Sequence, residues 1–125
     1  MSLAIKLQTA SAEYQKLDLD LSNVVEARQR LEAQLSENEL VKKEFSTLTS
    51  ENIIYKQIGP ALVKQDPAEA KAHVDTRLDF IRSEIKRVEE QLKNVGAAAE
   101  KKKVEIVNIQ ATIQQQAQQG AAEAS

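Results

Sequence analysis

Residues 53–66 read IIYKQIGPALVKQD, and they separate two long stretches in which apolar residues recur at helical spacing. The run 53–58 is rich in β-branched and aromatic residues, which favour a strand. The Gly-Pro pair that follows supplies turn chemistry, and Leu62 and Val63 can return as a second strand. We therefore predict one β-hairpin, over about residues 52–65, between two helices.

The stretch before the hairpin carries the 3.5-residue repeat of a coiled coil. Its core positions advance in alternating steps of four and three residues. They are Leu3, Leu7, Ala10, Tyr14, Leu17, Leu21, Val24, Arg28, Leu31 and Leu35. This pattern predicts a helix over about residues 3–49.

The stretch after the hairpin repeats the rhythm more regularly. Its main apolar positions are Val74, Leu78, Ile81, Ile85, Val88, Leu92, Val95, Ile106, Ile109 and Ile113. Asp66 can cap the first turn, and Pro67 suits the first helical position. We predict a helix over about residues 67–115. Residues 116–125 are rich in Gln and Ala without periodicity, so we expect a flexible tail there.

Two helices of matched length with a short connection should fold back on each other. The predicted fold is therefore dominated by α-helix: a single domain over residues 1–125, built as a long antiparallel coiled-coil hairpin. Counting outward from the hinge places Tyr14 near Lys102 and Leu31 near Ile85.

The β-hairpin has apolar side chains on both of its faces. A lone two-stranded hairpin is marginal in water, and its outer edges stay open to pairing. We therefore expect hairpins from several chains to join in a shared sheet or an oligomeric β-barrel. The residues that we assign to this assembly are Ile53, Ile54, Tyr55, Ile58, Leu62 and Val63.

Apolar residues also occupy outward heptad positions at the end of the coiled coil that holds both termini. An exposed apolar tip favours contact with other proteins. The tip residues assigned to this contact are Leu3, Ile5, Leu7, Val104, Val107 and Ile109.

The amino-acid composition argues against catalysis and against metal or cofactor binding. The chain has 125 residues, no cysteine, a single histidine (His73) and a formal net charge of −2 with acids and bases interspersed. Its three glycines are scattered, so no phosphate-binding loop is present. We expect no catalytic, metal or cofactor site, no nucleic-acid partner and no membrane span, and the absence of cysteine suits the cytosol.

Three stretches resemble the β-class prefoldin subunits, and within them a eukaryotic type: residues 54–66 (IYKQIGPALVKQD), 30–38 (RLEAQLSEN) and 77–81 (RLDFI). The single hairpin is also typical of the β class, because α-class subunits carry two.

The resemblance implies a subunit of a heterohexamer with other prefoldin subunits, joined by a double β-barrel from which six coiled coils protrude. It implies that the tips hold unfolded actin and tubulin without ATP and pass them to the cytosolic chaperonin. No catalytic residues are implied. The alternative is a structural coiled-coil tether or oligomerisation module without chaperone activity, which would need no two-faced hairpin and would not prefer unfolded chains.

Overall fold

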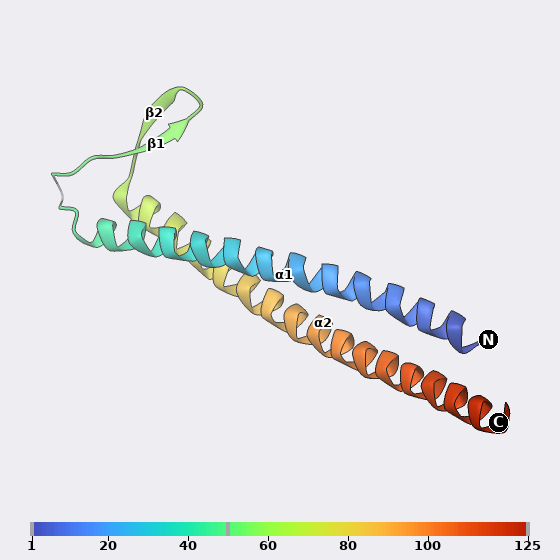
Figure 1. Cartoon of the computed structure of the whole chain (residues 1–125). Coiled ribbons are helices and arrows are strands. Elements are labelled where there is room, and N and C mark those ends of the chain that lie inside the picture. Colours follow the sequence, from blue (N-terminus) through green and yellow to red (C-terminus); the bar gives the residue numbers. More distant parts are fainter. Residues whose placement is uncertain (1, 50, 125) are drawn as a thin grey trace. The chain divides into compact units, whose positions relative to one another are not determined.

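The computed structural model describes residues 2–49 and 51–124, which form two long helices separated by a β-hairpin (Figure 1). Helix α1 spans Leu3–Ser46, strand β1 Ile54–Ile58, strand β2 Ala61–Gln65 and helix α2 Pro67–Ala124. The element order and the single hairpin agree with the prediction.

Helix α2 is longer than the sequence pattern predicts. The apolar repeat stops near residue 115, but the helix continues to Ala124. Gln and Ala both have favourable helix propensity, so the backbone can stay helical without a seam to bury. The flexibility expected for residues 116–125 remains a prediction, and Ser125 lies outside the described residues.

Both helices begin at local caps. The N–H of Ile5 donates to Ser2 Oγ at 3.2 Å, and the N–H of Ala68 donates to Asp66 Oδ1 at 3.0 Å. Each bond satisfies a first-turn donor that has no partner within its helix. Asp66 therefore plays the capping role predicted for it, and Pro67 takes the first helical position.

The two strands pair antiparallel, with Ile54 opposite Gln65 and Ile58 opposite Ala61. Gly59 has a φ of +58°, at the first position of the two-residue turn. A positive φ there is typical of hairpin turns and suits glycine, which has no Cβ to clash.

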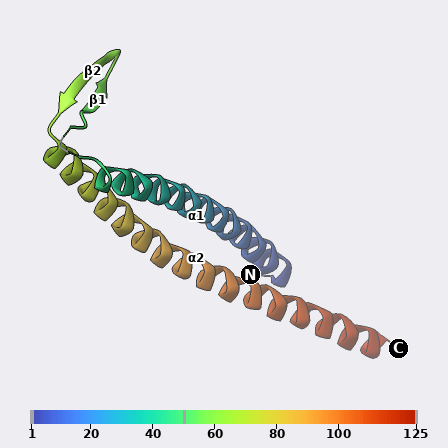
Figure 2. The same cartoon turned by 90° about the vertical axis from the view of Figure 1, so that its left-hand side faces the viewer.

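The chain divides into two compact units. We call residues 27–89, which include the β-hairpin, the hairpin unit, and residues 1–26 with 90–125 the terminal unit. In each unit the α1 and α2 segments lie side by side and antiparallel (Figures 1 and 2).

The core of the hairpin unit is a narrow seam. Among the residues of this unit that the structure describes, the buried ones all come from α2: Ala70, Val74, Leu78, Ile81 and Val88. The facing positions of α1, such as Leu31, Leu35 and Phe45, are only half-buried. Leu78 is the one large side chain with no exposed surface among the described residues.

The terminal unit has a thinner seam. Ala10 and Val24 of α1 and Ala99 of α2 are buried, and the other heptad positions are half-buried. Lys102 Nζ lies 2.6 Å from Oε2 of Glu13. Glu13 is the sequence neighbour of Tyr14, which counting from the hinge places near Lys102. The ion pair fixes the expected antiparallel register in this unit.

Candidate interaction surfaces

The β-hairpin presents apolar side chains on both faces. Strand alternation puts Ile54, Ile58 and Val63 on one face, and Tyr55 and Leu62 on the other. Leu62 is 68% exposed and Ile58 56% exposed. Ile53, Tyr55 and Val63 are exposed too, whereas Ile54 is half-buried.

Two strands also leave two open edges. The sheet contains only β1 and β2 in the described part of the chain, so each strand has one row of backbone groups without a strand beside it. Open edges next to two apolar faces invite pairing with other strands. The six residues assigned to assembly are thus brought together in one small element.

The helices of the hairpin unit carry further exposed apolar side chains outside the hairpin. Leu40 on α1 and Phe80 on α2 are both more than 60% exposed, and Val41 is partly exposed. They lie off the buried seam, where the heptad pattern places them.

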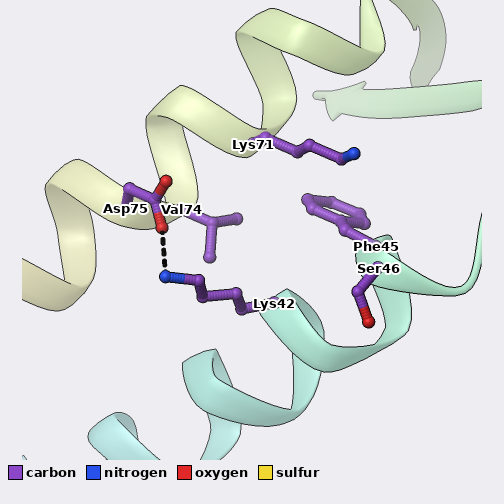
Figure 3. A pocket seen from close by; sticks show the side chains of 6 residues that line it. All are labelled: Lys42, Phe45, Ser46, Lys71, Val74 and Asp75. Carbon is purple, nitrogen blue, oxygen red and sulfur yellow. Dashed lines mark ion pairs between the residues drawn. The ribbon is translucent and has the colours of Figure 1, made fainter.

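Phe45 lies between two hollows near the end of α1. Figure 3 shows the first, lined by Lys42, Phe45, Ser46, Lys71, Val74 and Asp75. Phe45 and Val74 project into the space between the helices, and Lys71 extends from α2 toward Phe45 (Figure 3). Lys42 Nζ lies 2.9 Å from Asp75 Oδ1, so its charge is balanced.

The second hollow lies on the hairpin side of Phe45. Its apolar lining comes from both helices and from β1, through Val41, Phe45, Ile54, Ala70 and Val74. The polar side chains around it include Lys56, His73 and Arg77 and no carboxylate. We call this space the basic hollow.

In the terminal unit, the predicted tip residues divide into two groups. Leu3, Leu7 and Ile109 are half-buried seam residues. Ile5, Val104 and Val107 are each about half exposed, at 51%, 52% and 55%. Leu3, Val104 and Ile109 line one open groove, which also has charged Lys6, Lys101 and Glu105 along it. An apolar floor with charged margins suits a polypeptide better than a small rigid ligand.

Lys102 occupies a seam position in the terminal unit and forms ion pairs with two carboxylates. Its ammonium lies 2.6 Å from Glu13 and 2.9 Å from Glu105, and its side chain is 21% exposed. The hydrogen bond to Glu13, and then that to Glu105, raise the pKa of Lys102 above its ordinary value. Sequence reasoning found Lys102 but not these partners, which the heptad register itself could have indicated.

His73 and Glu89 are two further titratable residues of the hairpin unit. His73 is exposed on α2, and Glu89 is held by Arg28 at 3.0 Å. Within residues 2–49 and 51–124, no group of three His, Asp or Glu side chains is placed to hold a metal ion. No helix in that same part of the chain is long and apolar enough to cross a membrane.

The basic hollow is the feature that sequence reasoning missed. The i, i+4 spacing of His73 and Arg77 could indicate a shared helix face. Nothing in the linear pattern, however, brings Lys56 of β1 to that face.

Known proteins share this architecture. The crystal structure of the prefoldin β subunit from Thermococcus strain KS-1 superposes with a TM-score of 0.75 at 20% identity, covering 81% of this chain and 89% of that one. The prefoldin β2 subunit from the same strain has a TM-score of 0.63 at 25% identity, covering 73% of this chain and 97% of that one. The predicted fold of two helices joined by one hairpin is therefore confirmed.

Sequence relatives agree. Prefoldin subunit 6 of Mus musculus is 44% identical over 109 residues, covering 87% of this chain and 86% of the relative. Prefoldin subunit 6 of Saccharomyces cerevisiae is 38% identical over 101 residues, covering 81% and 89%. The family model described as "Prefoldin subunit" matches residues 8–120. The chain belongs to the prefoldin subunit family, as the resemblance of its hairpin and flanking helices indicates.

Proposed function

We propose that this chain is a subunit of a cytoplasmic heterohexameric co-chaperone, which holds unfolded proteins without ATP and delivers them to the cytosolic chaperonin. Its partners would be other prefoldin subunits, and its clients would include unfolded actin and tubulin. Membership of the prefoldin subunit family supports the co-chaperone role. We propose the clients, the independence from ATP and the delivery step because the family resemblance implies them.

The observation that carries the assembly proposal is the two-faced, exposed hairpin. Burying Ile53, Tyr55, Ile58, Leu62 and Val63 against other strands would remove apolar surface from water, at about 25 cal/mol per Å². Pairing the open strand edges would satisfy backbone groups at the same time. A shared barrel offers both gains together, and a monomer offers neither.

The exposed residues of the tip support client holding. Ile5, Val104 and Val107 present modest apolar surface, and Val104 also lines the groove that carries Lys6, Lys101 and Glu105. Each contact of this size would be weak, but several tips acting on one unfolded chain would give avidity. Weak, multiple contacts also allow release without nucleotide hydrolysis, which suits a sequence with no phosphate-binding loop.

The experiment is reconstitution from purified prefoldin subunits. The complete mixture should give one complex whose native mass equals six subunits, and this complex should suppress aggregation of denatured actin without ATP. Transfer of labelled actin from the complex to purified chaperonin tests delivery. A complex that forms but does not suppress aggregation would favour a structural tether, and a chain that stays outside the complex would refute the assembly proposal.

A further inference from the structure

The basic hollow combines an apolar floor with uncompensated positive charge. Phe45 of α1, Ile54 of β1 and Val74 of α2 form much of the floor. Lys56, His73 and Arg77 stand around it. No single stretch of sequence forms this hollow, because these lining residues come from two helices and a strand.

The two cationic side chains, Lys56 and Arg77, have little to balance them in the lone chain. Elsewhere in the hairpin unit, Lys42 pairs with Asp75, Arg82 with Glu39 and Arg28 with Glu89. Within residues 2–49 and 51–124, Lys56, His73 and Arg77 form no ion pair, and Arg77 donates only to the Asn38 amide oxygen at 3.4 Å. Like charges around one hollow repel each other, and a carboxylate placed among them would remove that cost.

The hollow is continuous with the hairpin surface. Ile54 and Tyr55 line it and also belong to the residues assigned to assembly. Any chain that pairs with β1 or covers its face therefore passes beside Lys56. This continuity favours an occupant from a neighbouring subunit.

We propose that the basic hollow receives an acidic, apolar segment of the neighbouring subunit, with an aliphatic or aromatic side chain against Phe45 and Val74 and an Asp or Glu between Lys56 and Arg77. This inference rests on the proposed function, because it needs a heteromeric complex. It adds an electrostatic contact that selects a partner, beyond the apolar contacts of the hairpin. A free phosphate fits less well, since it would leave the apolar side chains of Phe45, Ile54 and Val74 uncovered.

Neutralising the hollow tests the inference. The double variant Lys56→Gln with Arg77→Gln keeps side-chain length roughly constant and removes two charges. Its matched control is Lys64→Gln with Lys86→Gln: Lys64 is paired with Tyr55 on the same hairpin, Lys86 lies on α2, and neither lines the hollow. Circular dichroism should show the same helical content for both variants, because all four side chains are exposed.

The measured quantity is the dissociation constant of the chain from the other purified subunits, at low and at high salt. The hollow variant should bind about ten-fold or more weakly at low salt and lose much of the salt dependence, whereas the control should stay near wild type. Equal affinities and equal salt slopes for the two variants would overturn the inference while leaving the proposed function intact. A wild-type chain that never joins the complex would instead overturn both.

Carbodiimide coupling of the assembled complex gives a second readout, because it links an amine only to a carboxylate in contact with it. Digestion should yield a Lys56-containing peptide joined to an acidic, apolar peptide of a neighbouring subunit. Coupling of Lys56 solely to client, or its absence from all links in the complete complex, would contradict the proposal.

Discussion

Arg28 of α1 donates to Glu89 of α2 across 61 positions of sequence, with Nη2 and Oε1 3.0 Å apart. Arg28 also contacts Glu32 one turn later, at 3.1 Å. The hydrogen bond to Glu89, followed by the charge of Glu32, raises the pKa of the Arg28 guanidinium. An arginine at a core position of the heptad therefore fixes the register of the two helices by pairing with a specific partner.

Charge reversal tests this register contact. Arg28→Glu should lower the Tm of the chain by about 5 °C, because three carboxylates then meet where an arginine was. Adding Glu89→Arg should recover part of the loss by restoring one attractive pair. Thermal unfolding by circular dichroism measures both, with Arg30→Glu, an exposed arginine nearby, as the control. A double variant no more stable than Arg28→Glu would show that Glu89 does not stabilise Arg28.

Leu78 tests the apolar part of the seam. It has no exposed surface, so Leu78→Ala should lower the free energy of unfolding by about 2–4 kcal/mol through lost burial and a residual cavity. Urea unfolding of the chain provides the measurement. Leu40→Ala makes the same chemical change at a 62% exposed position, and we expect less than about 0.5 kcal/mol there. Equal losses would mean that the seam does not concentrate stability at Leu78.

The sequence predicts the seam well because a heptad repeat is a local rule. Val74, Leu78 and Val88 are predicted core positions, and all three are buried. The hairpin is equally local, since strand propensity and a Gly59-Pro60 turn lie within a few residues. Both features can be predicted from residue spacing and intrinsic secondary-structure propensity alone.

Partner choice and helix ends are less predictable. Lys102 reaches Glu13, although counting places it near Tyr14, because a long flexible side chain selects its partner among several residues within reach. The end of α2 depends on helix propensity after the seam stops, which periodicity does not report. The basic hollow depends on the fold itself, which brings Lys56 of β1 beside Arg77 of α2.

The Lys102 cluster gives a pH prediction. Because its pKa is raised by hydrogen bonds to Glu13 and Glu105, its contribution to stability is complete below the ordinary lysine pKa and is lost as pH rises through the raised value. Lys102→Gln should therefore lower the Tm at neutral pH, and the gap to wild type should narrow above about pH 10.4. Lys103→Gln, which changes an exposed neighbour, is the control. A gap that stays constant up to about pH 12 would contradict the role of the ammonium.

The hairpin prediction concerns assembly alone. Ile54→Asp with Ile58→Asp should abolish entry into the complex, because burying an unpaired carboxylate costs several kcal/mol. The helical signal should persist, since both changes lie in β1. Leu19→Asp with Val25→Asp makes comparable changes on α1, outside the hairpin, and should leave assembly intact. Size-exclusion chromatography of the mixed subunits distinguishes them, and an unchanged complex with the hairpin variant would refute a buried hairpin.

The tip prediction separates holding from assembly. Ile5→Ser, Val104→Ser and Val107→Ser change three exposed side chains and spare the seam, so the complex should form normally. Removing apolar surface from one tip should weaken client capture only in part, because the other subunits still contribute to avidity. We expect roughly two- to ten-fold more complex to be needed to suppress aggregation of denatured actin, measured by light scattering.

Two further variants decide what the tip contributes. Leu19→Ser removes another exposed aliphatic side chain from the same helix as Ile5. Because Leu19 lies 14 positions further from the N-terminus, away from the tip, this change should have no effect on capture. Ile106→Ser with Ile109→Ser instead loosens the half-buried seam. If the seam variant reduces capture while the three exposed changes do not, the tip serves only to hold the two helices together. Ile5, Val104 and Val107 would then be ordinary surface residues, and the client contacts would have to lie elsewhere on the coiled coil.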